Sequence, residues 1–158
     1  KNFFQWQPDA NGRPLVRVNG GKFRNVGIEA EYGRRLSDRL KWNVSGSYSN
    51  PRQKEMNETY WKQAAPKLQF TTGIRYESPT WEAGTSFSFV TKRLRNRDGG
   101  LNPNIALWNA YVGYHFNKDA TLRLDARNLL DRHNVITNGD YEYWGDPFTY
   151  ELSYTQKF

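Results

Sequence analysis

The chain has 158 residues, enough for one domain with a core of its own, so its size does not require disulfides or metal ions for stability. It contains no cysteine, which excludes thiolate catalysis, zinc ribbons and iron–sulfur ligation, and with only two histidines we expect no metal site. The net charge of +7 is compatible with a nucleic acid, an anionic lipid or an anionic ligand and does not select among them.

Aromatic residues make up 16% of the chain, although all hydrophobic types together reach only 37%. The amphipathic rings of Tyr and Trp favour membrane–water boundaries. No stretch approaches the roughly 20 apolar residues that a membrane helix requires, so a helical membrane protein is excluded. A membrane β-barrel stays open as an interpretation, because its strands are only half apolar.

Along the chain, apolar and polar side chains alternate with a period of two, which is typical of two-faced β-strands. In the last segment, for example, Tyr150, Leu152 and Tyr154 share one face, whereas Glu151 and Ser153 lie on the other. The alternation recurs almost to the exclusion of helical spacing, and it predicts eight strands within residues 1–7, 27–32, 40–48, 67–76, 81–89, 108–116, 121–130 and 148–158.

The connections between these segments alternate in length. In an up-and-down antiparallel sheet, alternate connections lie at opposite ends, so we expect all tight turns at one end and all long loops at the other. The tight connections are residues 33–39, 77–80 and 117–120, and the long ones, rich in Gly, Asn, Asp and Pro, are residues 7–25, 50–66, 91–105 and 131–147.

Pairing like faces and opposite charges predicts a register for each tight hairpin. Two of these registers place a carboxylate opposite a cation, and the third gains nothing electrostatically. The expected pairs are Tyr32 with Leu40 (Glu31 opposite Lys41), Tyr76 with Trp81 (Arg75 opposite Glu82) and Phe116 with Leu122 (His115 opposite Arg123).

The apolar faces could meet each other in a soluble β-sandwich or meet lipid in a membrane barrel. Three features favour lipid: the connections form a plain meander, the chain ends within a strand on Phe158, and aromatic residues cluster at both ends of the apolar faces. These two expected girdles contain Tyr32, Tyr76, Trp81 and Phe116 beside the tight turns, and Tyr48, Phe89, Trp108 and Phe148 near the long loops. The sequence thus favours an all-β, antiparallel up-and-down transmembrane β-barrel, whose polar face lines a lumen.

Three segments resemble the C-terminal part of TonB-dependent outer-membrane receptors. They are "NVGIEAEY" (25–32), "AAPKLQFTTGIRY" (64–76) and "LRLDARNLLDRHNV" (122–135), in which Asn128 to Arg132 occupy the family's Asn-Leu-Phe-Asp-Lys stretch. The last strand, with Tyr154 and the terminal Phe158, is similar to the outer-membrane insertion signal read by the barrel assembly machinery, although Gln156 departs from the alternation.

The resemblance implies that residues 1–158 are the C-terminal segment of a 22-stranded barrel, without its plug domain. It implies an outer-membrane receptor that takes up a ferric siderophore or similar scarce ligand with energy supplied by TonB. The expected partners are the rest of the barrel, the plug, TonB, lipopolysaccharide and outer-membrane lipid. The segment would bind no cofactor, the ferric chelate would be the cargo, and the C-terminus would be periplasmic. The alternatives are a complete eight-stranded barrel with a structural or adhesion role and a soluble β-sandwich binding protein.

Two long loops carry candidate ligand-binding residues. Lys92, Arg93, Arg95 and Arg97 could form an electropositive surface for an anionic ferric chelate, or could contact lipopolysaccharide phosphates or solvent. The aromatic residues of "NGDYEYWGDP" could stack on a planar or catecholate ligand, or pack the loop and form the outer girdle. They are Tyr141, Tyr143 and Trp144.

The polar face carries charges that we expect to pair mostly across strands. Asp125 lies between Arg123 and Arg127, and Glu151 could reach Arg127, but no nucleophile or second carboxylate in a catalytic arrangement accompanies Asp125, so we expect no enzyme. In a nucleic-acid-binding sheet the aromatic and basic residues would share a face, whereas here they alternate, which argues against such a partner.

Overall fold

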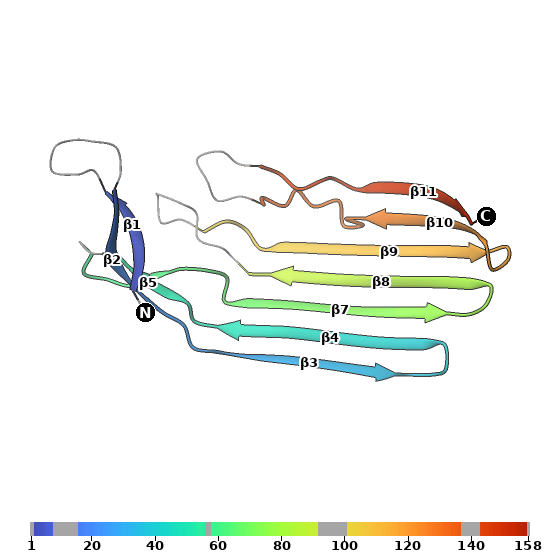
Figure 1. Cartoon of the computed structure of the whole chain (residues 1–158), viewed down its shortest axis with the longest axis horizontal. Helices are drawn as coiled ribbons and strands as arrows, with labels where there is room; N and C mark the ends of the chain where they lie inside the picture. The colour runs from blue at the N-terminus through green and yellow to red at the C-terminus, as the bar shows by residue number, and fades with distance from the viewer. Residues whose placement is uncertain (1, 8–15, 56–57, 92–100, 137–142, 158) are drawn as a thin grey trace.

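The computed structural model of the chain describes residues 2–7, 16–55, 58–91, 101–136 and 143–157, and all of the regular structure within them is β (Figure 1). Eleven strands form two sheets. Their bounds are β1 Asn2–Gln7, β2 Val16–Arg24, β3 Gly27–Arg35, β4 Leu40–Ser49, β5 Arg52–Lys54, β6 Lys62–Gln63, β7 Leu68–Glu77, β8 Trp81–Val90, β9 Ile105–His115, β10 Ala120–Arg127 and β11 Thr149–Gln156.

The larger sheet is an antiparallel meander in the order β11-β10-β9-β8-β7-β4-β3. Its tight turns lie at one end and its long connections at the other (Figure 1), which confirms the predicted up-and-down arrangement. β3 and β11 are the two edges and do not pair with each other. The described strands therefore form an open wall and do not close into an eight-stranded barrel.

The smaller sheet, in the order β1-β2-β5-β6, lies at the long-loop end of the wall (Figure 1). The prediction that residues 1–7 add a strand to the main sheet is wrong, because β1 pairs antiparallel with β2. β2 lies within the predicted long loop of residues 7–25, where Asn19, Gly20 and Gly21 are typical of turns. The two strands are close in sequence, which favours their pairing as a local hairpin.

The three predicted hairpin registers are also wrong, although each is displaced by an even number of residues. Because the period of a strand is two, even displacements leave every side chain on its predicted face. Tyr32 lies opposite Val44, Tyr76 opposite Ala83, and Tyr114, in place of Phe116, opposite Leu122. Glu31, Arg75 and His115 consequently face Ser45, Gly84 and Thr121.

Side chains within the turns account for these registers. Ser37 Oγ accepts from the amides of Arg39 and Leu40, at 3.3 and 3.1 Å, and Ser78 Oγ accepts from the Trp81 amide at 2.9 Å. Asn117 Oδ1 accepts in the same way from Asp119 and Ala120. Such bonds stabilise compact turns. β3 and β7 continue beyond their predicted ends, and β10 begins one residue before its predicted start.

The main sheet is a single layer with no hydrophobic core between layers. Among the described residues, the buried hydrophobic side chains are only Ala106, Ala120 and Val135. Large apolar side chains such as Ile28 and Leu152 are 70% and 65% exposed, and no second sheet covers them. The described structure is therefore not a β-sandwich, and its apolar face is available to lipid.

An aromatic row crosses the apolar face beside the tight turns. The ring centroids of Trp81 and Tyr114 are 4.8 Å apart, those of Tyr114 and Phe116 are 4.9 Å apart, and those of Phe116 and Tyr154 are 6.5 Å apart, all in edge geometry. The row thus joins strands β8 to β11, and it agrees with the predicted girdle at this end.

Two tryptophans on the apolar face have hydrogen-bond partners for their indole N–H groups. The indole of Trp42 donates to Thr72 Oγ1 at 2.9 Å, and this hydroxyl donates to the Asn43 carbonyl oxygen at 3.0 Å. Trp108 and Thr85 form the same arrangement, with Thr85 bonded to the Asn109 carbonyl. Paired polar groups are what a hydrocarbon environment requires.

In the described part of the chain, no helix is long and apolar enough to cross a membrane.

Candidate functional site

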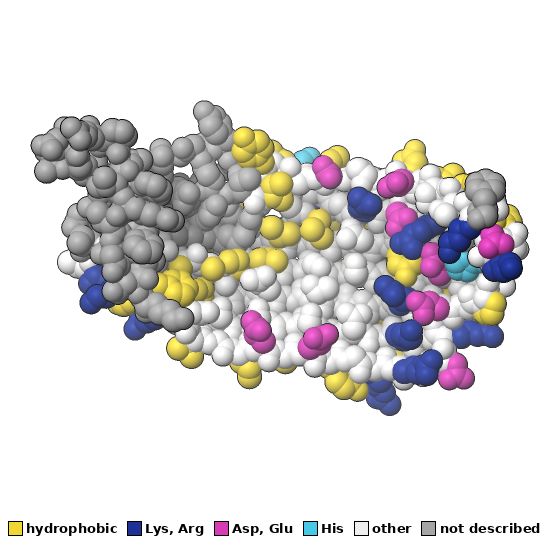
Figure 2. Space-filling model, in the orientation of Figure 1, with side chains coloured by type: hydrophobic (Ala, Val, Ile, Leu, Met, Phe, Trp, Pro, Cys, Tyr) yellow, Lys and Arg dark blue, Asp and Glu magenta, His cyan; other side chains and the backbone are white. Residues whose placement is uncertain are grey.

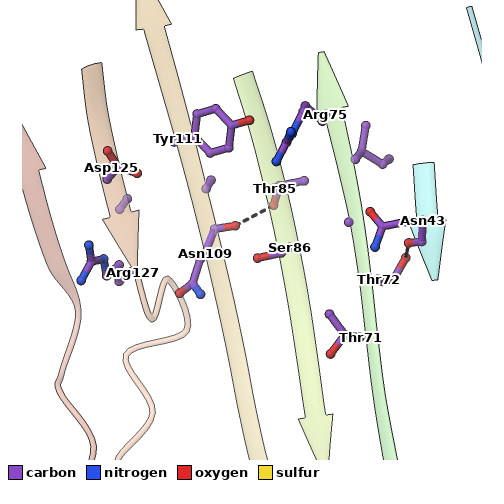
Figure 3. A pocket seen from close by; sticks show the side chains of 14 residues that line it. Asn43, Thr71, Thr72, Arg75, Thr85, Ser86, Asn109, Tyr111, Asp125 and Arg127 are labelled. Atoms are coloured by element: carbon purple, nitrogen blue, oxygen red, sulfur yellow. Dashed lines mark hydrogen bonds between the residues drawn. The ribbon is translucent and has the colours of Figure 1, made fainter. Parts of the chain in front are cut away.

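The opposite, polar face of the main sheet carries Ser, Thr, Asn and Gly over its middle and charged residues at the tight-turn end (Figure 2). On the middle strands a hollow of about 340 Å³ opens, and Figure 3 shows its lining. Its hydroxyl and amide groups come from Thr71, Ser86 and Asn109, with Arg75 and Arg127 at its borders. This surface can exchange hydrogen bonds with a polar partner without burying an unpaired charge.

Arg123 of β10 organises a network on the polar face that joins three strands. Its guanidinium donates two bonds of 2.8 Å to the Asp125 carboxylate and one of 2.9 Å to Glu82 Oε1 on β8. It also stacks over the Tyr111 ring on β9, with Cζ 3.8 Å from the centroid. Bidentate pairing combined with stacking is characteristic of Arg. The bond to Glu82 crosses between strands as expected, whereas Asp125 pairs with Arg123 within β10.

Two glycines provide the space for this network. A Cβ at Gly113 would lie 2.7 Å from Cγ of Glu82, whose side chain crosses β9 at this point to reach Arg123. A Cβ at Gly84 would lie 2.6 Å from the Tyr111 ring. Both glycines lie directly opposite the residue that covers them, so the close approach requires the absence of a side chain.

Arg127 and Glu151 form the predicted ion pair between β10 and β11. Arg127 Nη2 lies 3.6 Å from Glu151 Oε2, and both side chains are about two-thirds exposed, at 67% and 66%. Exposed pairs of this kind contribute little to stability. The pair shows that the polar faces of β10 and β11 lie on the same side of the sheet.

The small sheet carries a cluster of cations that sequence reasoning missed. Lys22 and Arg24 of β2 lie directly opposite Lys54 and Arg52 of β5, so four cations share one face, and we call them the outer basic surface. Arg24 Cζ also lies 4.5 Å over the Trp61 ring. Like charges in directly opposed positions are unfavourable, and among the described residues no carboxylate pairs with these cations.

A signal for this cluster was present in the sequence. Lys-x-Arg at 22–24 and Arg-x-Lys at 52–54 each place two cations on one face of an extended segment. The two segments are separated in sequence by strands β3 and β4, and the sequence does not reveal that they pair.

The predicted ligand-binding residues are only partly described. Lys92, Arg93, Arg95, Arg97 and Tyr141 lie outside the described residues, as does Phe158 of the predicted assembly signal. Tyr143 and Trp144 lie in the loop between β10 and β11 and are 60% and 54% exposed. Trp144 contacts the His133 ring edge-on at 5.7 Å, and the backbone of Tyr143 accepts a hydrogen bond from Ile136.

Tyr154, the other predicted assembly residue, lies on the apolar face of β11. Its ring is 59% exposed, and its hydroxyl donates to Gln156 Oε1 at 2.6 Å. Gln156 thus has a polar partner at the position where the alternation departs from the apolar pattern.

The segment after β10 is held by buried asparagines. Asn128 is 2% exposed and has a positive φ of 51°; its amide donates to the carbonyls of Arg132 and Asp146 and accepts from the Arg132 amide. The Asn134 amide binds both the N–H and the carbonyl of Ala106 on β9. These bonds continue the hydrogen bonding of the β9 edge beyond the end of β10, which explains the asparagines in "LRLDARNLLDRHNV".

The open single-layer sheet, apolar on one face and polar on the other, is a segment of a transmembrane-type β-barrel wall. Residues 1–129 match the family "TonB dependent receptor-like, beta-barrel", so the chain belongs to this family. The family assignment confirms the resemblance seen in the sequence.

Solved structures of TonB-dependent receptors share the fold. The ferric citrate transporter FecA in its unliganded form matches 99% of this chain and 27% of its own, with a TM-score of 0.76 and 23% identity. The copper transporter OprC matches 100% of this chain and 28% of its own (TM-score 0.71, 17% identity). The ferric-catecholate import receptor Fiu from E. coli K12 matches 98% of this chain and 23% of its own (TM-score 0.72, 17% identity).

The chain thus spans about a quarter of the length of these receptors. No curated protein matches the sequence.

Proposed function

We propose that the chain forms wall and outer loops of an outer-membrane receptor that imports a ferric siderophore or a similar scarce metal chelate with energy from TonB. One observation carries the proposal. The seven-stranded wall exposes an apolar face on one side and a hydrogen-bonding face on the other, and it continues at its long-loop end into a sheet with a basic surface. A transport receptor requires these three parts together, because it must meet lipid, enclose a polar lumen and capture a ligand.

The nature of the cargo is inferred from chemistry and from the names of the related receptors. FecA is a ferric citrate transporter, Fiu a ferric-catecholate import receptor and OprC a copper transporter. An anionic ferric chelate fits the outer basic surface, since guanidinium groups bind carboxylates in bidentate fashion. We include Lys92, Arg93, Arg95 and Arg97 in the same ligand-binding region, with Tyr141, Tyr143 and Trp144 as aromatic contacts. The role is transport, and we assign no catalytic residue.

In the proposed orientation, the tight turns and the C-terminus face the periplasm and the long loops face outward. The lumen would hold a plug domain outside this chain, and TonB would act through that domain. The barrel assembly machinery would read Tyr154 and Phe158, and lipopolysaccharide would surround the outer loops.

Uptake of radiolabelled iron in cells tests the proposal. Cells that produce the full-length receptor should accumulate ferric citrate or a ferric catecholate, and cells without the receptor or without TonB should not. Replacing Lys22, Arg24, Arg52 and Lys54 by Gln should weaken binding of an anionic chelate, whereas Lys118→Gln, at the tight-turn end, should leave it unchanged. Uptake that is equal with and without TonB would overturn the proposal.

A further inference from the structure

The last two strands, β10 and β11, are joined by a long connection, residues 128–148, so no tight turn aligns them (Figure 1). The closure entropy of a long connection depends only weakly on its length, so it tolerates more than one register. Alternation does not decide the register either, because a displacement of β11 by two residues keeps Tyr150, Leu152 and Tyr154 on the apolar face. The observed register therefore requires another cause.

The charges on the two strands do not select the observed register. Asp125 lies directly opposite Glu151, and like charges in this position are unfavourable. Glu151 reaches Arg127 only diagonally, at 3.6 Å. If β11 moved by two residues, Glu151 would lie directly opposite Arg127 or, in the other direction, opposite Arg123.

Only one of these two displacements is compatible with the backbone. The displacement toward Arg123 would bring Pro147 into the ladder opposite Arg127, and proline has no N–H to donate there. The displacement toward Arg127 meets no such obstacle. It would place Leu124 opposite Tyr154 in place of its observed partner Leu152.

Two side chains after β10 hold the residues that precede β11. The Asn128 amide donates to the Asp146 carbonyl oxygen at 2.9 Å, and the Phe148 N–H donates to Asp131 Oδ1 at 2.9 Å. Asn128 is in turn held on β9, because its backbone N–H donates to Asn109 Oδ1 at 3.0 Å. Asn128 and Asp131 both have a positive φ, 51° and 46°, which Asn and Asp adopt more readily than other residues except glycine.

We propose that Asn128 and Asp131 set the register of β11 on β10 during assembly of the barrel, and we call this pair the register clamp. Thr149, the first residue of β11, directly follows Phe148 and lies opposite Arg127, which directly precedes Asn128. The clamp thus closes the long connection at the first pair of the ladder, and both of its bonds would be lost in the displaced register. A displacement by two residues would also move the other edge of β11 by about 7 Å, so the strand that closes the barrel would meet the wrong donors and acceptors.

Disulfide trapping in the full-length receptor, with cysteines elsewhere replaced by Ser, tests the register clamp. A cysteine at Leu124 is combined with a cysteine at Leu152, its observed partner, or at Tyr154, its partner in the displaced register. The Lys157 N–H donates to the Asp119 carbonyl oxygen, so odd-numbered residues form the hydrogen-bonded pairs of this ladder. Leu124 and Leu152 are therefore a non-hydrogen-bonded pair with Cα atoms about 4.5 Å apart, which suits a disulfide, whereas diagonal neighbours are too distant.

Cells that produce each receptor are oxidised, and mass spectrometry measures the ratio of the 124–154 disulfide to the 124–152 disulfide. With the clamp intact, the 124–152 disulfide should dominate. The double substitution Asn128→Gly and Asp131→Gly should raise the ratio about tenfold or more, because two hydrogen bonds that favour the observed register are lost while glycine tolerates the positive φ.

Two further variants separate the register from stability. Asp131→Asn keeps an Oδ1 acceptor and should leave the ratio unchanged. Asn134→Ala removes the two bonds to Ala106, which loosens the connection without changing the clamp, and should also leave the ratio unchanged. An unchanged ratio in the double variant, or an equal rise in Asn134→Ala, would overturn the inference. If the double variant does not fold, as judged by its heat-modifiable mobility in gel electrophoresis, Asp131→Gly alone is compared with Asp131→Asn, and equal ratios in these two variants would overturn it.

Discussion

Asn128 combines a left-handed backbone with a buried amide that makes three hydrogen bonds, so it supports two tests at one position. Asn128→Ala leaves the groups around it unpaired and retains the cost of a positive φ, and it should destabilise the folded receptor by about 3 kcal/mol. Asn128→Gly loses the same hydrogen bonds, but glycine adopts a positive φ without strain. Its loss of unfolding free energy should therefore be about 1 kcal/mol smaller than that of Asn128→Ala.

Urea unfolding of the purified receptor, followed by tryptophan fluorescence, measures both losses. Leu130→Ala is a suitable control, because this side chain is 41% exposed. Equal midpoints for wild type and Asn128→Ala would show that the amide bonds contribute nothing.

Gly84 tests the close contact with Tyr111. Gly84→Ala places a methyl group 2.6 Å from the ring, so the ring must leave its position over Arg123 and the receptor should lose about 1–3 kcal/mol. In a Tyr111→Ala background, Gly84→Ala should lower the free energy of unfolding much less, because the Tyr111 ring that the new methyl group would meet is absent. A double-mutant cycle of unfolding free energies measures the coupling. If the losses of the two single variants add up to the loss of the double variant, the contact between position 84 and the Tyr111 ring is absent.

At the scale of elements, the small sheet contains one ion pair whose pH dependence can be derived. The hydrogen bond between Lys62 of β6 and Glu58 lowers the pKa of Glu58 from 4.5 and raises the pKa of Lys62 from 10.5. The contribution of Glu58 is present above pH 4.5 and is lost as the pH falls through the lowered pKa. The contribution of Lys62 is present below pH 10.5 and is lost as the pH rises through the raised pKa.

The difference in hydrogen-exchange protection of residues 52–63 between wild type and Glu58→Gln should therefore be constant near neutral pH. It should vanish well below pH 4.5, where the wild-type carboxyl is protonated. Asp38→Asn, in the tight turn between β3 and β4, is the control, since the Asp38 side chain forms no ion pair with a described residue. A difference that persists in acid would contradict the ion pair.

The seven strands of the wall and the orientation of their faces could be predicted from the sequence, because alternation is a local property of the chain. The registers could not, because alternation allows any even displacement, and the choice depends on the turns capped by Ser37, Ser78 and Asn117. The outer basic surface was missed for a related reason. It arises from cross-strand neighbours, and these depend on long-range pairing.

At the scale of the whole molecule, charge and apolar surface are separated. Among the described residues, cations gather on the small sheet and at the tight-turn end, whereas the middle of the wall is apolar on one side and rich in hydroxyl and amide groups on the other. This distribution places charged side chains near the two membrane surfaces or in the lumen, where water or a partner can stabilise them.

This distribution can be tested by spin labelling, since the chain contains no cysteine and cysteines elsewhere in the receptor can be replaced by Ser. Single cysteines at Tyr150, Glu151, Leu152 and Ser153 of β11 carry the label in the receptor reconstituted into lipid bilayers. Relaxation by oxygen, which is soluble in lipid, should be strong at Tyr150 and Leu152, which are 75% and 65% exposed on the apolar face, and weak at Glu151 and Ser153. A label at Lys118 in a tight turn should instead respond to a water-soluble nickel complex. If accessibility to oxygen does not alternate along β11, or alternates with the opposite phase, the assignment of the apolar face to lipid is wrong, and with it the assignment of the polar face to the lumen.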